Sequence, residues 1–244
     1  SRGDSLNSDI HCGTSGSERR MIYFNQRDYA NIPYPAPGYE RATIKTSGCG
    51  VAVFAMLIAN KLDKTYTVQK AAKFAIENGA RVSGGTDMDI LLKAASKHFP
   101  LKYERKTGIS SALSAVRYNK SMCIANVGKS GLFSDGGHYV LIADVGQVYL
   151  SVLDPYLYDG KFQKAGRRGK VTVSNNICYV RPEDLAQDAK GYYVITEVDK
   201  MTVQEALSVL QQKGIVKSPT YWQNAVQVVK YLDELLVNMA EHVK

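Results

Sequence analysis

The most apolar stretch of the 244-residue chain runs from Val51 to Ala59 and contains no charged residue. A run that is apolar at every position predicts a helix buried on all sides, and this helix is expected to end near Asn60 and Lys61. Cys49 lies between two glycines just before the run. The unpaired backbone N–H groups and the positive dipole at a helix start favour a thiolate over a thiol. Cys49 is therefore a candidate nucleophile, and a buried, inert thiol is the alternative.

Two amphipathic helices are predicted after this apolar helix. Thr67 is expected to cap a helix that ends at Glu77, because a threonine hydroxyl accepts a hydrogen bond from a free N–H group of the first turn. Thr86 is expected to cap a second helix at 87–98, which Pro100 ends. The other elements predicted in this half of the chain are a strand-like aromatic run at 21–29, a proline-containing loop at 33–37 and a short helix at 111–117.

Strand patterns dominate the sequence after Leu101. Short runs rich in Val, Ile and Tyr between turn residues are typical of antiparallel strands. Cys123 and Cys178 fall inside two such runs and are predicted to be core residues. Because helices come first and strands later, the sequence predicts an α+β domain with N-terminal helices packed on an antiparallel sheet. The predicted strands are 122–127, 138–144, 148–154, 171–173, 177–180 and 192–198.

The last segment is predicted to form a helical hairpin. Thr202 and Glu205 have the spacing of a capping box and open a helix that ends at Gly214. Pro219 starts another helix, whose apolar stripe would pack on the first helix, on the main domain or on another chain. The stripe comprises Trp222, Val226, Val229, Leu232, Leu236 and Met239.

These patterns divide the chain into a linker or tail at 1–19, a main domain at 20–199 and a helical appendage at 200–244. The tail is rich in Ser, Gly and Asp. A start at Ser1, without Met, indicates a fragment or processed chain, so other domains are expected upstream of Ser1. No uncharged run approaches the roughly 20 residues of a membrane helix, so no membrane span is predicted.

The net charge of +8 predicts attraction to polyanions such as nucleic acid, anionic membranes or bacterial wall polymers. Basic residues gather at 161–170, where Arg167 and Arg168 lie between two glycines. This basic cluster is either a solvated loop or the wall of a groove that meets an anionic ligand. Only Phe162 offers a stacking face there, which disfavours nucleic acid as a partner. The four cysteines lack any C-x-x-C pair, so no disulfide framework, metal or cofactor is expected.

A thiol nucleophile needs a base and a group that orients the base. Of the four histidines, His11 lies in the tail, His98 at a helix end and His242 near the C-terminus. His138 remains, at the point where a glycine loop enters a predicted strand. A tight turn near 146 pairs residues whose numbers sum to about 292, which places His138 opposite Asp154. Asp154 is the predicted orienting group, and the alternative is an Asp that caps the following turn.

The Gly-Cys49-Gly turn into an apolar helix, the Gly-Gly-His138 strand start and the Asp154-Pro155 strand end resemble the papain-like cysteine peptidases. The nearest group is the bacterial family akin to double-glycine (bacteriocin-leader) peptidases, although the C-G-[SA]-C-[WY] signature of papain itself is absent. The resemblance implies that Gln26, in the context Asn-Gln-Arg-Asp-Tyr, forms the oxyanion hole with the Cys49 backbone N–H. The predicted substrate-binding residues are Gly48, Gly137, Arg167 and Arg168.

The C-terminal helices resemble the ends of clostridial and phage wall lysins, through the motif Ser218-Pro219-x-Tyr221-Trp222. The two resemblances and the basic charge predict a cysteine endopeptidase that cuts stem or crossbridge peptides of bacterial peptidoglycan. Such an enzyme would be a phage endolysin or bacterial wall hydrolase, located outside the cell, in the wall or on a virion. The alternatives are a peptidase that processes proteins or leader peptides, and a non-catalytic module for wall binding or assembly.

Overall fold

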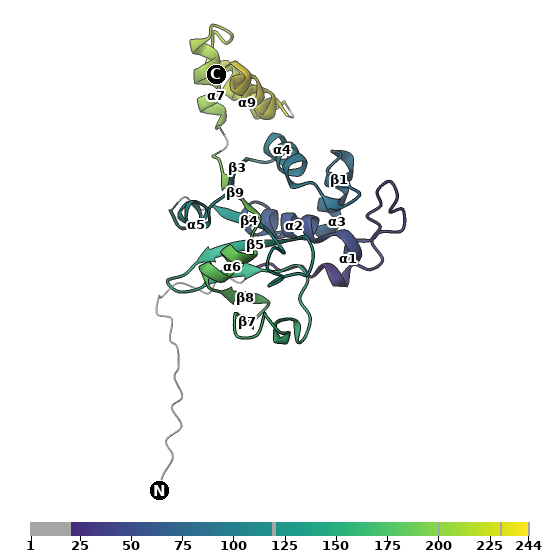
Figure 1. Ribbon diagram of the computed structural model, residues 1–244. Helices are drawn as coiled ribbons and strands as arrows, with labels where there is room; N and C mark the ends of the chain where they lie inside the picture. Colours follow the sequence, from purple (N-terminus) through teal and green to yellow (C-terminus); the bar gives the residue numbers. More distant parts are fainter. Residues whose placement is uncertain (1–20, 119–120, 200, 230, 244) are drawn as a thin grey trace.

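The computed structural model describes residues 21–118, 121–199, 201–229 and 231–243. The predicted tail at 1–19, which contains His11, lies outside the described residues. Seven strands form one antiparallel sheet in the order β3-β9-β4-β5-β6-β8-β7 (Figure 1). The predicted α+β class is confirmed. The strands are β3 Leu101–Lys106, β4 Met122–Val127, β5 His138–Val145, β6 Leu150–Leu153, β7 Val171–Ser174, β8 Ile177–Val180 and β9 Gly191–Glu197, and a separate pair joins β1 Arg81–Val82 to β2 Gly85–Thr86.

Helices cover both faces of the large sheet, and α2 and α5 lie on opposite sides of it (Figure 1). On one face, the side chains of α2, α3 and α4 share a hydrophobic cluster with Ile124 and Leu141. On the other face, α5 and α6 share a second cluster with Ala125 and Val140. The helices of the main domain are α1 Ile44–Ser47, α2 Cys49–Lys61, α3 Val68–Glu77, α4 Met88–His98, α5 Ile109–Tyr118 and α6 Pro182–Asp188, with short 3₁₀ turns η1 Gln26–Asp28 and η2 Lys161–Gln163.

The predicted apolar helix is α2, in which every residue from Gly50 to Ala59 is buried. Thr67 caps α3 as predicted, because its side chain accepts a hydrogen bond from the Lys70 backbone N–H. The cap of α4 differs from the prediction: Asp87 accepts from the Ile90 N–H. Thr86 is instead buried and hydrogen-bonds to the Tyr34 hydroxyl at 2.8 Å.

The prediction of a strand at 21–29 is wrong. Residues 26–28 form η1, and the flanking chain makes long-range polar contacts instead of a strand ladder. The Tyr23 hydroxyl donates to the Asp154 backbone oxygen at 2.8 Å, and the Gln26 backbone N–H donates to the Pro155 oxygen at 2.7 Å. The N-terminal segment is thereby fastened to the end of β6, close to the predicted orienting carboxylate.

The sequence did not predict β3 and α6, nor the shorter elements α1, β1, β2 and η2. The sequence of β3, LKYERK, is largely polar because β3 is an edge strand in which only Leu101 is buried. The α6 helix is short and buries only Leu185 and Asp188. Edge strands and short helices carry little of the apolar periodicity on which sequence assignments depend.

The loop between β4 and β5 is held in place by a buried carboxylate. Asp188 Oδ1 accepts hydrogen bonds from the backbone N–H groups of Ser130 and Leu132, and its Oδ2 accepts from Phe133. These hydrogen bonds to the ionised form outweigh the effect of burial and lower the pKa of Asp188. Gly128 has φ +101°, and a Cβ there would lie 1.8 Å from the Gly136 oxygen. The path of the chain into β5 is therefore closely constrained.

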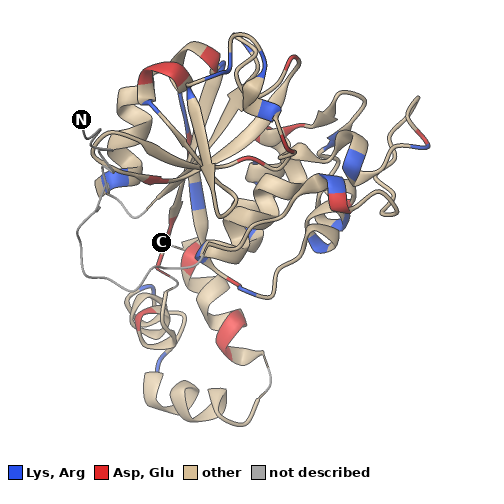
Figure 2. Ribbon diagram, turned by 90° about the horizontal axis from the view of Figure 1, so that it is seen from below, with Lys and Arg blue, Asp and Glu red and all other residues tan. Residues whose placement is uncertain are grey.

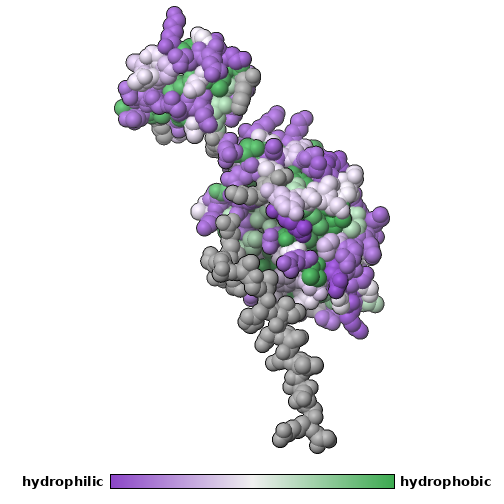
Figure 3. Space-filling model, turned by 90° about the vertical axis from the view of Figure 1, so that its left-hand side faces the viewer, coloured by the Kyte–Doolittle hydropathy of each residue, from purple (hydrophilic) through white to green (hydrophobic). Residues whose placement is uncertain are grey.

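The C-terminal helices α7 Val203–Gln212, α8 Pro219–Val226 and α9 Leu232–Val243 have a hydrophobic cluster of their own. They form a group beyond the end of β9 (Figures 1 and 3). The capping box of Thr202 and Glu205 is present, and α7 and α9 form the predicted hairpin. The predicted continuous stripe is broken, because Tyr231 has φ +66° between α8 and α9 and Val229 is 50% exposed.

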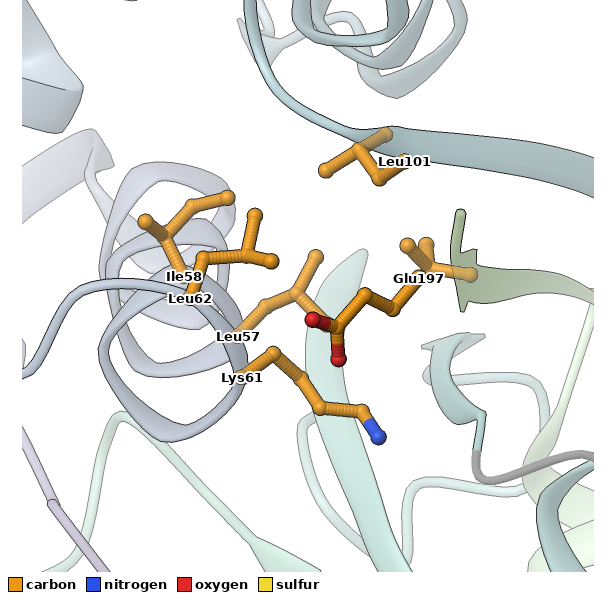
Figure 4. A pocket seen from close by; sticks show the side chains of 7 residues that line it. Leu57, Ile58, Lys61, Leu62, Leu101 and Glu197 are labelled. Atoms are coloured by element: carbon orange, nitrogen blue, oxygen red, sulfur yellow. The ribbon is translucent and has the colours of Figure 1, made fainter. Parts of the chain in front are cut away.

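A small apolar pocket lies at the end of α2 away from Cys49, between α2 and the strands β3 and β9 (Figure 4). Its volume is about 10 Å³, room for about one water molecule, so it is no candidate substrate site. It is lined by Leu57, Ile58, Lys61, Leu62, Leu101, Ile195 and Glu197.

Candidate active site

Cys49 is the first residue of α2, and its thiol is half-buried and free. The preceding residue, Gly48, forms the sharp turn between α1 and α2. A Cβ on Gly48 would lie 2.5 Å from the backbone oxygen of Ile44, so this turn needs glycine. At the first position of a helix, the backbone N–H of Cys49 has no partner within the helix. The Cys49 sulfur and the Cys49 backbone N–H therefore lie together at the start of α2.

His138 begins β5, where it is paired with Val127 of β4. The imidazole is 6% exposed, and its Nε2 lies 2.9 Å from Asp154 Oδ1. The imidazole also hydrogen-bonds to the Cys49 thiol, and because Nε2 faces the carboxylate, Nδ1 is the ring nitrogen left for this bond. The structure therefore brings together the three residues that the sequence nominated as nucleophile, base and orienting group.

The strand register differs from the prediction although the contact is present. The pairs Leu141–Leu153 and Ile142–Val152 displace β6 by two residues from the predicted alignment, with an irregularity between Ile142 and Asp144. Side chains alternate faces with a period of two, so a displacement of two residues keeps Asp154 on the same face of the sheet as His138. By extension of this register, Asp154 is a diagonal neighbour of His138 and not its direct partner.

Each charged group of the site stabilises the charge of its neighbour and so shifts the pKa of that neighbour. Burial alone would raise the pKa of the Cys49 thiol, but hydrogen bonding and charge interaction with His138, and backbone N–H groups, lower it below its ordinary value. Burial would lower the pKa of His138, but Asp154 and Cys49 together raise it to about 9. Hydrogen bonds and charge interactions with His138 and Lys161 outweigh burial and hold the pKa of Asp154 at about 2. These interactions favour a thiolate on Cys49 beside an imidazolium on His138.

We expect a bell-shaped pH dependence of kcat/KM for any reaction that uses this thiolate–imidazolium pair. The acidic limb reflects protonation of Cys49, and the alkaline limb, near pH 9, reflects loss of the His138 proton. Initial rates between about pH 4 and 10.5, at constant ionic strength, measure both limbs. An alkaline limb near 6.5, the ordinary histidine value, would contradict the proposed interaction of His138 with its two neighbours.

Lys161 lies behind Asp154, a position that sequence reasoning did not assign to it. Its Nζ donates to Asp154 Oδ2 at 2.5 Å and to the Tyr156 backbone oxygen at 2.9 Å. Lys161 is 3% exposed and Asp154 is fully buried. Asp154 Oδ1 also accepts from the Tyr156 backbone N–H at 2.9 Å. No sequence signal separates Lys161 from the other basic residues of its segment.

Gln26 is buried beside the turn that leads to Cys49. Its Nε2 donates to the Lys45 backbone oxygen at 2.9 Å and, more distantly, to the Ile44 oxygen at 3.4 Å. The backbone N–H of Gln26 is bonded to Pro155. The structure thus places Gln26 between the segment before the nucleophile and the segment after Asp154. Its role in an oxyanion hole stays a prediction.

The remaining predicted substrate-binding residues have different surroundings. Arg167 is 4% exposed and donates to the Gly131 oxygen at 2.7 Å and to Asp135 Oδ1 at 2.6 Å. Arg168 is exposed and donates to the Gln163 oxygen. Gly137 directly precedes His138, and no heavy atom lies within 4 Å of where its Cβ would be. Arg167 therefore supports the loop before β5, and Gly137 faces open space.

Acidic residues from other segments pair with most of the basic cluster. Lys161 contacts Asp154, Lys164 and Arg167 contact Asp135, and Lys170 contacts Asp184. Lysine and arginine are dispersed among acidic residues along the described chain (Figure 2). No acidic residue occurs within the run 161–170, and its acidic partners come from distant parts of the sequence. The sequence of the run alone therefore gives no sign of these ion pairs.

The other described thiols and imidazoles have no comparable arrangement. Cys123 and Cys178 are buried in the core as predicted, and burial raises the pKa of both thiols. His98 is exposed and packs against Phe74 and Phe99. Within the described ranges, no cluster of His, Cys, Asp or Glu is suited to hold a metal. Among the described helices, none has the length and apolarity to cross a membrane.

A groove of about 730 Å³ lies beyond Lys161. It is lined by Asn25 and Arg27 on either side of Gln26, by the segment 157–163 and by residues of the edge strand β7. The guanidinium of Arg27 lies over the rings of Tyr156 and Tyr158. This groove is the larger of the two hollows described, and the α2 pocket is the smaller.

Comparison with solved structures gives several remote neighbours, two of which are described below. Neither a protein-family model nor a curated protein sequence matches the chain. One neighbour is a double glycine motif protease from an AMS/PCAT transporter in complex with the leader peptide, with 17% identity over 61% of this chain and 81% of that one and a TM-score of 0.39. The other is the peptidase domain of Streptococcus ComA, a bi-functional ABC transporter, with 17% identity over 68% and 96% and a TM-score of 0.42. Both neighbours are of the kind that the sequence resemblance named.

Proposed function

We propose that the protein is a cysteine peptidase with Cys49 as its nucleophile. The observation that carries the proposal is the half-buried Cys49 thiol, whose pKa is lowered by His138, while the imidazole is held at 2.9 Å by the buried Asp154. Such an arrangement stabilises a reactive thiolate. A non-catalytic wall-binding or assembly module has no use for these charges, so the catalytic function is preferred.

The reaction follows from the protonation states of the pair. The Cys49 thiolate attacks the peptide carbonyl carbon and forms a C–S bond, and the carbonyl oxygen becomes an oxyanion. The His138 imidazolium gives its proton to the leaving amine as the C–N bond breaks, which leaves a thioester on Cys49. Neutral His138 then takes a proton from water as the water attacks the thioester. Release of the carboxylic acid product restores the thiolate and the imidazolium.

We propose that the oxyanion is stabilised by the backbone N–H of Cys49 and the side-chain amide of Gln26. One N–H of Gln26 Nε2 is committed to Lys45, whereas the 3.4 Å approach to Ile44 is long for a hydrogen bond. The second N–H is therefore the proposed donor to an oxyanion at Cys49, reached by a small rotation of the whole amide. Donors held in place before the reaction stabilise developing charge effectively.

A polypeptide is the proposed substrate, with processing of a protein or leader peptide placed ahead of peptidoglycan cleavage. The peptidoglycan hypothesis was supported by resemblance and by the basic charge. Lys161 and Arg167 are buried in ion pairs, and Lys164 and Lys170 each lie near a carboxylate at the surface, so less of the charge of the basic cluster is available to attract an anionic wall polymer. Peptide hydrolysis itself needs no such attraction.

The test offers both substrate classes to the purified protein and to a Cys49→Ala variant. One arm contains a mixture of synthetic peptides, including sequences with a Gly-Gly pair, and the other contains Gram-positive peptidoglycan. Mass spectrometry identifies new termini in each arm. We expect Cys49-dependent cleavage in the peptide arm.

Cys49-dependent products in the wall arm alone would favour peptidoglycan and the extracellular location expected with it. Products that persist in Cys49→Ala, or glycan fragments in place of peptides, would overturn the proposed function. Circular dichroism of the variant confirms that loss of activity is not loss of fold.

A further inference from the structure

Lys161 is the only lysine or arginine of the described residues that contacts the Asp154 carboxylate. The ammonium group and the carboxylate are 2.5 Å apart and both are sealed from solvent, at 3% and 0% exposure. A buried charge requires compensation by a partner of opposite sign, because removal from water is costly. Lys161 belongs to η2, in the segment that separates Asp154 from β7. This segment therefore supplies a charge to the centre of the candidate site.

The charges of the site change in pairs during peptide hydrolysis. Before attack, Cys49 is negative, His138 positive and Asp154 negative. In the thioester, Cys49 and His138 are both neutral, and Asp154 has lost its cationic partner on the imidazole side. Without another cation, the buried site would carry one net negative charge in both states.

We propose that Lys161 is a positioning residue that keeps the buried Cys49–His138–Asp154 site electrically neutral in both halves of the reaction. It holds the carboxylate through Oδ2 while Oδ1 faces the imidazole. It thereby limits how strongly the Asp154 charge raises the basicity of the imidazole, whose proton on the Cys49 side must pass to the leaving amine. This inference rests on the proposed function, in that Cys49 and His138 are taken as the reacting pair.

The other titratable groups around the site do not supply a second charge near neutral pH. Tyr23 and Cys178 lie near Asp154, and Tyr34 and Tyr139 lie near Cys49. Burial raises the pKa of each of these groups, so all four stay neutral. The rings of Tyr156 and Phe162 also face the Lys161 ammonium, at 5.9 and 5.6 Å from their centroids. The buried guanidinium of Arg81 lies over the Tyr34 ring and does not contact the Asp154 carboxylate. Among the groups in direct contact, the charge balance therefore depends on Cys49, His138, Asp154 and Lys161.

The test follows the pH dependence of Cys49 alkylation by iodoacetamide, which needs no substrate. A Cys12→Ser background removes the thiol of the N-terminal segment, and mass spectrometry identifies the alkylated peptide. The wild-type profile is expected to show two steps, formation of the ion pair and then loss of the His138 proton near pH 9. Removal of a nearby positive charge moves both steps to higher pH.

Lys161→Met and Lys161→Gln are expected to shift both steps upward by about one pH unit, a roughly tenfold slower alkylation on the acidic flank. Glutamine keeps a hydrogen-bond donor but no charge, so it separates the two roles: a purely structural hydrogen bond predicts a wild-type profile for Lys161→Gln. Lys161→Arg keeps the charge and is expected to retain both steps. Lys164→Met removes a neighbouring charge that pairs with Asp135 at 3.8 Å, and it is the matched control.

Folded Lys161→Met and Lys161→Gln variants with the wild-type profile would overturn the inference. If neither neutral variant folds, the profile of Lys161→Arg decides: retained steps support the role of charge, and displaced steps overturn it. Failure of the proposed function is a separate result, namely absence of peptide cleavage by a protein whose alkylation profile behaves as expected. The two proposals can therefore fail independently.

Discussion

Replacement of His138 by alanine is expected to lower kcat/KM for peptide cleavage by about three orders of magnitude or more. The imidazole stabilises the Cys49 thiolate and supplies the proton that the leaving amine requires. Without it, the Cys49 pKa returns upward, because burial then acts without the compensating interaction. Alkylation of Cys49 at pH 7 should slow in parallel. Steady-state kinetics on a peptide cut by the wild-type protein gives the first measurement, and iodoacetamide labelling gives the second.

The control for this substitution is His98→Ala. His98 is exposed at the end of α4, where it packs against Phe74 and Phe99, so its loss removes an imidazole without touching the site. Its activity should remain close to that of the wild type. If His138→Ala retained more than about a tenth of wild-type activity, His138 would not be the base.

Substitution of Gly128 by alanine is expected to destabilise the fold by more than about 3 kcal/mol. Gly128 has φ +101°, which side-chain-bearing residues rarely adopt, and the added Cβ would lie 1.8 Å from the Gly136 backbone oxygen. Backbone cannot swing aside as a flexible side chain can, so the loop before β5 must rearrange. Urea unfolding followed by circular dichroism measures the loss as a lower midpoint at unchanged slope.

Gly136→Ala is the matched control for Gly128→Ala, because it adds the same methyl group to the same loop. No heavy atom lies within 4 Å of the Gly136 Cβ position, and its φ is not in the left-handed region. Its free energy of unfolding, obtained from the urea midpoint and slope, should lie within about 0.5 kcal/mol of the wild-type value. Equal losses in the two variants would mean that the contact with the Gly136 oxygen is not what requires glycine at 128.

The helix that carries the nucleophile could be predicted because its sequence leaves no choice. Val51 to Ala59 is apolar at every position, and a helix without a polar face can only be buried. His138 and Asp154 were found by elimination among few histidines and by strand alternation. The register was wrong by two residues, yet the contact was correct because side-chain direction repeats every two residues.

Interactions that join distant segments could not be predicted in this way. Lys161 was one basic residue among several until the fold placed it against Asp154. The partners of the basic cluster, Asp135 and Asp184, come from the β4–β5 loop and α6. A single sequence gives the residue types along each element but not which loops come into contact. Basic residues that are predicted to bind a ligand can therefore be paired with carboxylates of the same chain.

The strand order has a consequence for how the protein is made. Strand β9 is the last of the main domain in sequence, yet it lies between β3 and β4 in the sheet. The Tyr23 hydroxyl reaches the Asp154 oxygen across 131 residues of chain. Such distant pairings form slowly, because large loops must close before any contact compensates for the lost entropy. During synthesis, Cys49 therefore emerges long before its partners, and a chain that stops short of β9 lacks a central strand of the sheet that carries His138.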